Sequence, residues 1–354
     1  MGGRENVLQI ASLLGKNYFF LPDFRGWAEG ERVGGCPHIL GEVRKVPKHF
    51  RSLQDFSRQE LQALIDRAMV LKQEKRAGVI HRQLRGKTVG LIFEKPSTRT
   101  RVSFEAAMYG LGGQVIFLSG RDTQLARSEP LKDMSRVMSR YVDGMVVRTF
   151  GQEVVEELAA YATVPVINAL TDLHHPCQVL SDIMTVIEKK GPIAERTIAW
   201  VGDGNNMANS WIQAAAIFGF RLVLACPEGY GPNEEILAAA RAVATRPIVL
   251  GHDPRAAVAE ADVINVDVWA SMGMEAEAEE RLRVFSRFQL DDALLHAAPA
   301  EAIVLHCLPA HRGEEITEEV LESARCVAFD QAENKMHIHK AILESLLGSS
   351  QALP

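Results

Sequence analysis

Apolar and polar positions recur along this chain with two periods, and these periods predict strands and helices that follow one another. Residues 57–60, Ser-Arg-Gln-Glu, fit a capping box at a helix start, and apolar side chains then recur at helical spacing from Leu61 to Leu71. Strands are predicted next at 88–93, 114–118, 145–148 and 164–168, and helices at about 98–111, 130–141, 153–161 and 176–189.

A second alternating set begins after Lys189–Pro192, where Lys-Lys-Gly-Pro breaks the pattern. Strands are predicted at 197–201, 221–225, 248–250, 263–266 and 303–306, with helices after Gly204, at 234–244, from Asp253–Pro254 and at about 332–347. Repeated strand–helix alternation predicts parallel sheets covered by helices. The sequence therefore predicts an α/β fold with two doubly wound parallel-sheet domains.

The composition agrees with this division and excludes several classes of protein. At about 150 residues per domain, a chain of 354 residues is expected to hold two domains. Apolar residues make up 47% and charged residues 24%, which excludes a mainly disordered or fibrous protein. A net charge of −6 disfavours non-specific nucleic-acid binding, and no apolar run reaches the ~18 residues that cross a bilayer. Five cysteines without a Cys-x-x-Cys pair disfavour a disulfide framework or structural zinc site, and favour a reducing compartment.

The first 45 residues differ from the rest of the chain. They contain two Gly-Gly pairs and an aromatic patch at 18–20, and they show no sustained helical or strand period. Val7–Gly15 is mildly apolar, but Glu5 precedes it and no small-x-small cleavage site follows, which disfavours a secretory signal. We interpret residues 1–45 as a loosely ordered N-terminal extension, or as the product of a start codon assigned too early.

Ligands of parallel sheets bind at the carboxyl ends of strands, in the loops that lead to helices. One such loop, Glu94–Arg101, holds Ser97 as a natural helix cap within a Ser-Thr-Arg-Thr-Arg run. Free backbone N–H groups at a helix start, hydroxyls and guanidinium groups together suit a phosphate dianion. A capped helix with solvated arginines is the alternative, but it does not explain the density of threonine and arginine.

Two further loops place polar side chains at predicted helix starts. His174–Gln178 puts an imidazole and an amide in the first turn of a helix, where both could donate to a carbonyl oxygen; a structural histidine is the alternative. Gly202–Asn206 resembles half of a dinucleotide-binding fingerprint, but the third glycine would fall at Met207 and no acidic residue ends the next strand. The asparagines could instead bind a polar small molecule.

The last two loops combine a carboxylate with a thiol. Asp267 ends a strand and can pair with a substrate amine, while the hydroxyl and glycine backbone of Ser271–Gly273 can hold a carboxylate; a capped strand–helix loop is the alternative. Cys307 ends another strand, within His306–Pro309. From its position, this cysteine could be a nucleophile, a polar contact or a buried thiol.

These motifs occur in the order found in the carbamoyltransferases: Ser97–Arg101, His175–Gln178, Asp267 with Ser271–Gly273, and His306–Pro309. Over about residues 46–348 the sequence resembles the ornithine carbamoyltransferases of the aspartate/ornithine carbamoyltransferase superfamily. The first two motifs resemble the carbamoyl-phosphate half that the superfamily shares, and the last two resemble the ornithine-specific half.

The resemblance implies an active site in the cleft between the two domains. It implies a carbamoyl-phosphate-binding domain at 46–190, an ornithine-binding domain at 191–331, and a C-terminal helix within 332–354 that packs back on the first domain. The implied reaction transfers the carbamoyl group of carbamoyl phosphate to the side-chain amine of L-ornithine, giving L-citrulline and phosphate, as in arginine biosynthesis. The resemblance further implies no metal or organic cofactor, and a homotrimer or assembly of trimers. From the charge, the apolar runs and the cysteine usage we expect a cytoplasmic protein with no nucleic-acid or membrane partner.

The resemblance also assigns site residues. Carbamoyl phosphate is expected to contact Ser97, Thr98, Arg99, Thr100, Gln124, Arg148, His175, Gln178, Cys307, Leu308 and Lys335, and ornithine to contact Asn206, Asp267, Ser271 and Met272. Arg148, His175, Asp267 and Cys307 are the expected catalytic residues. Negative charge builds on the carbonyl oxygen as the amine attacks, so preorganised donors are the expected catalytic device. Gln124 matches a position that reaches the site of a neighbouring subunit.

One residue departs from the family pattern. Within Glu333–His337, Lys335 stands where the family usually carries an arginine that contacts carbamoyl phosphate. Lysine keeps the positive charge but lacks the planar, two-pronged geometry of a guanidinium group. The sequence therefore predicts weaker binding of carbamoyl phosphate than in relatives, without loss of activity.

Other functions stay open at this point. The nearest is a carbamoyltransferase for another amine, such as putrescine or an acylated ornithine, although Asp267 with Ser271–Gly273 favours free ornithine. A nicotinamide-dependent oxidoreductase is conceivable through Gly202–Asn206, and Lys335 leaves room for a ligand-binding pseudoenzyme. The sequence does not decide between a biosynthetic and a catabolic direction.

Overall fold

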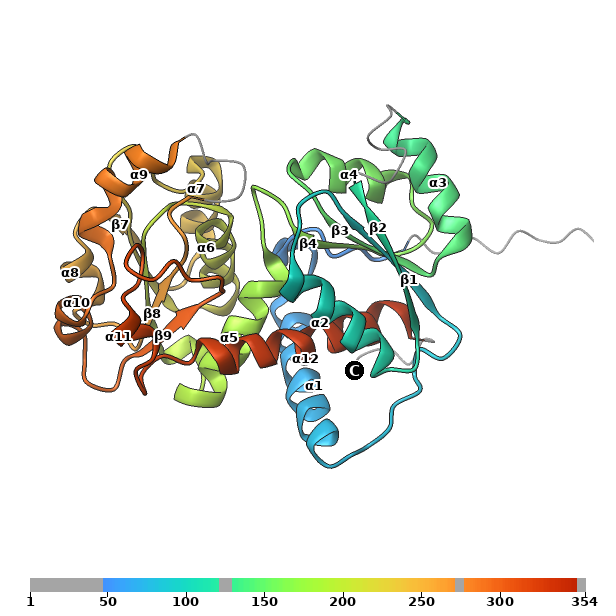
Figure 1. Ribbon diagram of the computed structural model, residues 1–354, viewed down its shortest axis with the longest axis horizontal. Helices are drawn as coiled ribbons and strands as arrows, with labels where there is room; N and C mark the ends of the chain where they lie inside the picture. The colour runs from blue at the N-terminus through green and yellow to red at the C-terminus, as the bar shows by residue number, and fades with distance from the viewer. Residues whose placement is uncertain (1–46, 121–128, 271–276, 349–354) are drawn as a thin grey trace, which may run out of the picture. The chain divides into compact units, whose positions relative to one another are not determined.

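The computed structural model of this chain describes residues 47–120, 129–270 and 277–348 (Figure 1). Within these residues the strands form two parallel sheets covered by helices, so the predicted α/β fold with two parallel-sheet domains is confirmed. Residues 1–45, interpreted as an extension, lie outside the described residues. Among the described helices, none is both long enough and apolar enough to cross a membrane.

The first sheet has four strands in the order β2-β1-β3-β4. They are β1 (Thr88–Phe93), β2 (Gln114–Ser119), β3 (Gly144–Arg148) and β4 (Val166–Leu170). One face carries α1 (Arg58–Arg76), α2 (Thr98–Tyr109), α5 (Pro176–Lys190) and α12 (Ala328–Leu347), and the other carries α3 (Leu131–Tyr141) and α4 (Gln152–Tyr161) (Figure 1). Successive side chains of a strand face opposite sides, so Leu91 and Phe93 pack with the first group of helices and Ile92 packs with α3 and α4.

The second sheet has five strands in the order β7-β6-β5-β8-β9. They are β5 (Thr197–Val201), β6 (Arg221–Ala225), β7 (Ile248–Gly251), β8 (Val263–Val266) and β9 (Ile303–His306). Trp200 packs with α6 (Asn206–Phe218) and α7 (Glu234–Val243), while Val201 packs with α8 (Pro254–Val258), α10 (Asp292–Ala297) and α11 (Glu318–Leu321). The helix α9 (Ala278–Phe285) follows the gap after residue 270.

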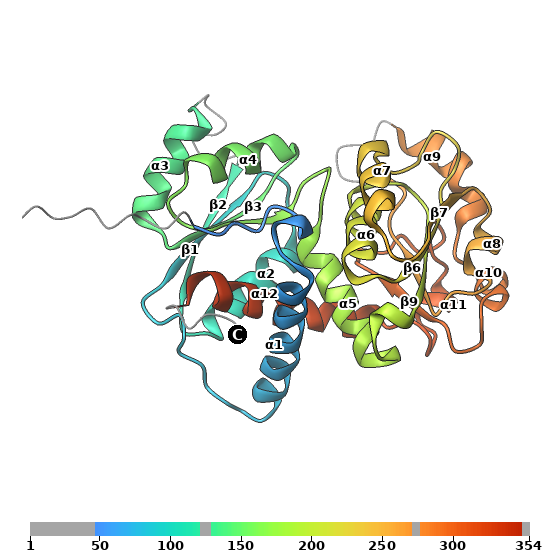
Figure 2. The same ribbon diagram turned by 180° about the vertical axis from the view of Figure 1, so that it is seen from behind.

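A single apolar core reaches from the first sheet to the second, and it includes residues of α5 and α12. The last helix, α12, packs against α1, α2 and α5, and Figure 2 shows it beside α1 and α2. Burial of an entire helix face is the main source of helix stability in a protein of this kind. As a consequence, polar side chains of α12 lie in the interior, next to loops of both sheets.

Two element boundaries differ from the sequence prediction in a way that affects the site. The fourth strand was predicted at 164–168 but runs from Val166 to Leu170, because Pro165 has no amide hydrogen and cannot donate to the ladder. The last helix was predicted from 332 but begins at Ala328, where Val327 offers no side-chain cap that could mark the start. This earlier start places Gln331 in the first turn of α12.

Candidate active site

A cavity of about 330 Å³ lies where the loops after strands of both sheets meet, with one side chain of α12 in its wall. The predicted site residues that the structure describes all line it: Ser97, Thr98, Arg99, Thr100, Arg148, His175, Gln178, Asn206, Asp267, Cys307, Leu308 and Lys335. The predicted contacts Gln124, Ser271 and Met272 lie outside the described residues. Residues more than 200 positions apart in the sequence are thus brought to one place.

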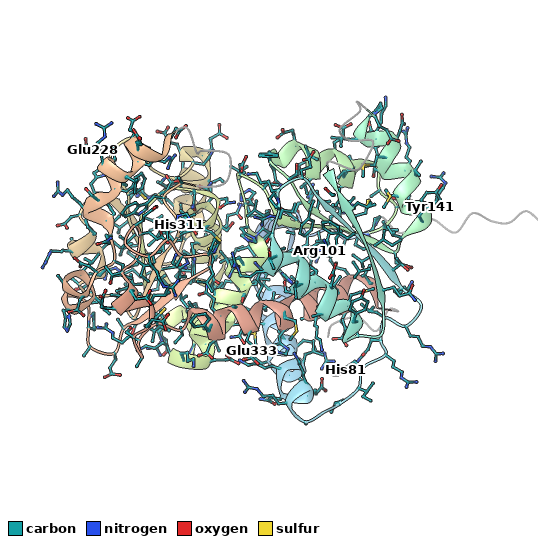
Figure 3. All side chains as sticks on the ribbon, viewed as in Figure 1. His81, Arg101, Tyr141, Glu228, His311 and Glu333 are labelled. Atoms are coloured by element: carbon teal, nitrogen blue, oxygen red, sulfur yellow. The ribbon has the colours of Figure 1, made fainter. Side chains whose placement is uncertain are left out.

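The start of α2 forms one wall of the cavity. Ser97 Oγ accepts a hydrogen bond from Thr100 N at 3.2 Å, so the serine caps the helix as predicted. The positive end of the helix dipole therefore faces the cavity beside the Thr98 and Arg99 side chains. Arg101, the second arginine of the motif, pairs with Glu105 at 2.9 Å and lies over the Phe117 ring; it is labelled on α2 in Figure 3.

Two buried cationic side chains, Arg148 and Lys335, also line the cavity. Arg148 ends β3, and its Nε has no hydrogen-bond partner among the described residues. Lys335 Nζ lies 3.2 Å from Thr100 Oγ1. Burial, and in second place the charge of Arg148, lowers the pKa of Lys335 to about 8, while burial lowers the pKa of Arg148 to about 10. Both groups are cationic at neutral pH and incompletely neutralised, which suits a site for an anion.

His175 and Gln178 belong to the first turn of α5. His175 N donates to Ser210 Oγ at 2.8 Å, so a serine of α6 completes the start of α5. Burial, followed by the nearby charges of Lys335 and Arg148, lowers the pKa of His175 well below its ordinary value. The imidazole is therefore neutral at pH 7 and can donate one N–H to a ligand oxygen.

Asp267 and Cys307 face each other at the carboxyl ends of β8 and β9. Cys307 Sγ donates to Asp267 Oδ1 at 3.0 Å, and Asn205 Nδ2 donates to Asp267 Oδ2 at 3.0 Å. Burial, together with the charge of Asp267, raises the pKa of Cys307 well above its ordinary value. Of the three interpretations left open by the sequence, the polar contact fits best, because a protonated thiol bonded to a carboxylate is a poor nucleophile.

The turn after β9, which contains Cys307, Leu308 and Pro309, lines the cavity. Leu308 has φ = +56°, a left-handed conformation that is costly for a branched side chain. His306 Nδ1 accepts from Leu308 N at 2.9 Å, so Nε2 carries the ring proton and donates to Glu315 Oε1 at 2.9 Å. Because His306 and Glu315 are fully buried, they hold this strained turn in place.

The loop after β5 is closely packed at Gly204. A side chain at Gly204 would clash with the backbone of Gly231 and Pro232, the nearest atom lying at 2.1 Å, and Gly204 N donates to Tyr230 O at 2.9 Å. The glycine is thus required by a neighbouring chain segment and not by a pyrophosphate. Asn206, predicted to bind ornithine, donates through Nδ2 to Thr171 O at 2.5 Å and also lines the cavity.

Several cavity residues were given no role from the sequence. Lys95 is buried, pairs with Asp172, and lies over the Phe150 ring. Lys95 belongs to the quoted Glu94–Arg101 loop, whereas no sequence signal singled out Asp172. His311, labelled in Figure 3, also lines the cavity.

His311 belongs to a small group that could in principle hold a metal ion. Ligand atoms of His311, Glu314 and Glu315 lie within 4.8 Å of one another. Glu315 Oε1 already accepts hydrogen bonds from His306 Nε2 and His311 N, and Glu314 lies 3.4 Å from His311 Nδ1. Glu315 Oε2 is buried without a hydrogen-bond partner among the described residues, and the expectation that the protein needs no metal stays a prediction.

Comparison with known proteins places both halves of the cavity in one family. Residues 48–188 match the aspartate/ornithine carbamoyltransferase carbamoyl-P binding domain, and residues 194–346 match the Asp/Orn binding domain of the same family. The chain is 72% identical to ornithine carbamoyltransferase of Desulfotalea psychrophila over 303 residues, which are 86% of this chain and 100% of that protein. It is 52% identical to the anabolic ornithine carbamoyltransferase of Pseudomonas aeruginosa over 300 residues, covering 85% and 97%.

A solved structure extends the likeness to three dimensions. The fold matches that of ornithine carbamoyltransferase from Pyrococcus furiosus with a TM-score of 0.84 and 47% sequence identity, covering 86% of this chain and 99% of that one. The matched regions contain every described residue of the cavity. From its sequence, its fold and the residues of its cavity, the chain belongs to the aspartate/ornithine carbamoyltransferase family.

Proposed function

We propose that this chain transfers the carbamoyl group of carbamoyl phosphate to the side-chain amine of L-ornithine, giving L-citrulline and phosphate. One observation carries the proposal: a single cavity has a cationic helix start on one side and the Asp267–Cys307 pair on the other. Relatives named ornithine carbamoyltransferase, at up to 72% identity over nearly their whole length, support the same reaction. The anabolic name of one relative supports a place in arginine biosynthesis.

The phosphate group is held on the side of the first sheet. The capped start of α2 offers backbone N–H groups, two threonine hydroxyls and the Arg99 guanidinium. Arg148 and Lys335 add positive charge from β3 and α12. Cations that are already buried lose little solvation when the substrate arrives, so they act strongly on its dianion.

The carbamoyl group lies next to the phosphate, within reach of α5 and of the turn after β9. His175 and Arg148 donate to its carbonyl oxygen, where negative charge grows during attack. The carbonyl groups of Cys307 and Leu308 accept from its NH₂ group. The strained backbone of Leu308, held by His306, aims these carbonyls before the substrate binds.

Ornithine approaches from the side of the second sheet. Asp267, with Cys307 beside it, pairs with the α-amino group of ornithine, and Asn206 also contacts the amino-acid end of this substrate. The attacking amine must be neutral, against a pKa of ~10.4 for a lysine-like ammonium. Fixing both substrates in one cavity lowers the entropic part of the barrier. The carbamoyl group is already activated by phosphate, so no covalent enzyme intermediate is needed.

The test is a citrulline assay with carbamoyl phosphate and a panel of amines. Ornithine should be carbamoylated at least tenfold faster than putrescine or acylated ornithine, because Asp267 is a buried partner for an α-amino group. Turnover with another amine but not with ornithine would overturn the proposal. A change in nicotinamide absorbance with a redox substrate would instead support the oxidoreductase alternative.

We also propose a division of the chain into a carbamoyl-phosphate half at 46–190, an ornithine half at 191–331 and a C-terminal segment at 332–354, and a homotrimer or assembly of trimers in the cytoplasm. Exposed apolar side chains on α2 and on the edge strand β2 support self-association: Val102, Tyr109 and Ile116. Light scattering should give a mass that is a multiple of three chains; a monomer at micromolar concentration would contradict the assembly.

A further inference from the structure

The side-chain amide of Gln178 has a nitrogen that donates hydrogen bonds and an oxygen that accepts them, and the nitrogen is already bonded. The side chain is buried in the first turn of α5 and lines the cavity. Its Nε2 donates to Asp182 Oδ1 at 2.8 Å, one helical turn further along α5. Its Oε1 is buried and has no hydrogen-bond partner in the described part of the chain. The polar atom of Gln178 that is left without a partner is therefore a hydrogen-bond acceptor, Oε1.

Asp182 is fixed in turn by a residue of α12. The carboxyl group is fully buried, and Oδ1 also accepts from Gln331 Nε2 at 2.6 Å. Gln331 Oε1 accepts from His306 N at 2.9 Å. Because His306 N is a donor, the oxygen of the Gln331 amide must face it, and the nitrogen must face Asp182. The orientation of each amide is thus determined by its partner and not by a choice between equivalent positions.

The arrangement does not depend on the charge of the carboxyl group. Burial raises the pKa of Asp182 to about 7, against the opposing effect of the two glutamine bonds and of Lys335. Asp182 Oδ2 has no hydrogen-bond partner within the described residues, so it can carry the proton while Oδ1 still accepts from both amides. An acceptor at the Oδ1 position is what the two glutamines require.

We propose that Asp182 is a positioning residue which, supported by Gln331, turns the Gln178 carbonyl oxygen toward the NH₂ group of the carbamoyl substrate. Asp182 acts only through Gln178 and does not touch the substrate. The inference rests on the proposed function and adds to it a reason for selecting an NH₂ group at this place. If the Gln178 amide were reversed, its own NH₂ would face the NH₂ of the substrate, and two donors would oppose each other.

Acetyl phosphate separates this role from a general structural one. It has a methyl group where carbamoyl phosphate has NH₂, so it keeps the phosphate and carbonyl contacts and cannot donate to Gln178. The measured quantity is a ratio: the inhibition constant of acetyl phosphate, competing with carbamoyl phosphate, divided by the KM for carbamoyl phosphate. Loss of the hydrogen bond from the carbamoyl NH₂ group to Gln178 leaves that NH₂ group without a partner, and this should lower the ratio about tenfold.

Three variants give the comparison. Asp182→Leu removes the acceptor and should lower the ratio about tenfold, mainly by raising the KM for carbamoyl phosphate. Asp182→Asn keeps one acceptor oxygen for both glutamines and should restore the ratio to within about threefold of the unchanged protein. Thr185→Val is the matched control, because Thr185 is buried on α5 and accepts from Asn334 of α12 without contacting the cavity. It should leave the ratio unchanged.

A double variant tests whether Asp182 acts through Gln178. Gln178→Met alone should lower the ratio as far as Asp182→Leu does, and the two changes together should lower it no further. Should Asp182→Leu fail to fold, Gln331→Met removes the support from α12 and should lower the ratio about threefold.

Three outcomes would overturn the inference. Asp182→Leu could weaken the binding of acetyl phosphate and carbamoyl phosphate equally, it could leave the ratio unchanged, or the losses of Asp182→Leu and Gln178→Met could add in the double variant. Citrulline formation by the unchanged protein is measured in parallel. If the unchanged protein formed no citrulline, the proposed function itself would be overturned. If it formed citrulline normally and Asp182→Leu left the ratio unaltered, only the role of Asp182 would be overturned.

Discussion

The helix starts of α2 and α6 both follow an interior strand of their sheet and both carry a capping side chain, yet they offer opposite chemistry to the cavity. Ser97 uses its hydroxyl to cap α2, and among the described residues no carboxylate is bonded to Ser97. Asn205 caps α6 through Oδ1, while its Nδ2 donates to Asp267 Oδ2. The second helix start thus has an anion supplied by the protein, and the first is left for an anion of the substrate.

This difference shows that a helix start alone does not specify an anion site. The dipole and the free backbone N–H groups are the same in both places. The surrounding charges decide the outcome: Arg99, Arg148 and Lys335 around α2, but Asp267 beside α6. One cavity can therefore bind an anion on one side and an amine on the other, and the two sides can be tested separately.

The largest effect is expected from removing a cation on the α2 side. Arg148→Gln should lower kcat by about 10³-fold, because the guanidinium serves both the phosphate and the carbonyl oxygen on which charge develops. Steady-state citrulline assays measure the loss. Arg136→Gln, an exposed arginine on α3, is the matched control and should keep kcat within about twofold, as surface charges usually do. A comparable loss in both variants would show that overall charge, not the site, is responsible.

A change on the other side should spare the phosphate. Asp267→Asn is expected to raise the KM for ornithine on the order of 100-fold, because it removes the buried charge opposite the substrate amine. The inhibition constant of inorganic phosphate should stay within about threefold, since the phosphate lies against α2. Asp253→Asn, which keeps a capping side chain on α8, is the control. A large weakening of phosphate binding by Asp267→Asn would contradict the division of the cavity into two sides.

A smaller effect is expected at Lys335, where the sequence departs from its family. Lys335→Arg should lower the KM for carbamoyl phosphate about threefold to tenfold by adding a second hydrogen bond. An unchanged or higher KM would contradict the predicted weakness of lysine at this place. Lys340→Arg, another lysine largely buried on α12 but outside the cavity lining, is the control and should leave the KM unchanged.

The unchanged chain and Lys335→Arg should also differ in how their kcat/KM for carbamoyl phosphate depends on pH. The pKa of Lys335 is lowered to about 8, so the free protein carries this charge below pH 8 and loses it above. The kcat/KM for carbamoyl phosphate should therefore fall as pH rises through about 8 in the unchanged chain. In Lys335→Arg, kcat/KM should fall only near pH 10, because burial lowers the pKa of Arg148 to about 10. Comparison at equal ornithine removes the titration of the second substrate, and identical profiles would contradict the assignment to Lys335.

The smallest effect is expected from the N-terminal segment that precedes the family match. Deleting Met1–Arg44 should leave the rate of citrulline formation within about twofold, because changes outside the matched family domains are expected to affect the site little. The family match begins at residue 48, and the described cavity lining begins at Lys95. A large loss of activity would show that the segment contributes to the fold or to an interface.

Much of the fold was readable because the signals are local. Alternating periods located every strand of both sheets, and capping residues such as Ser57 and Ser97 marked helix starts that the structure confirms. Boundaries without such a signal were wrong by a few residues: Val327 gives no cap to α12, and the strand after Pro165 begins later than the apolar run. The short helices α9, α10 and α11 were not predicted, since they span at most eight residues and show too little of a period.

The site divides in the same way. The amino-acid sequence alone determined which loops carry chemistry, because cap, hydroxyl and guanidinium groups cluster within a few residues of one another in the chain. Only the tertiary structure decided which of these groups share the cavity, turning Arg101 away and bringing in Asp172 and His311. It also joined Asp182, Gln331 and His306 into one hydrogen-bonded chain. Such long-range partners leave no periodic trace in the sequence, because only the packing of α12 against α5 and β9 brings the buried carboxyl group and the two amides together.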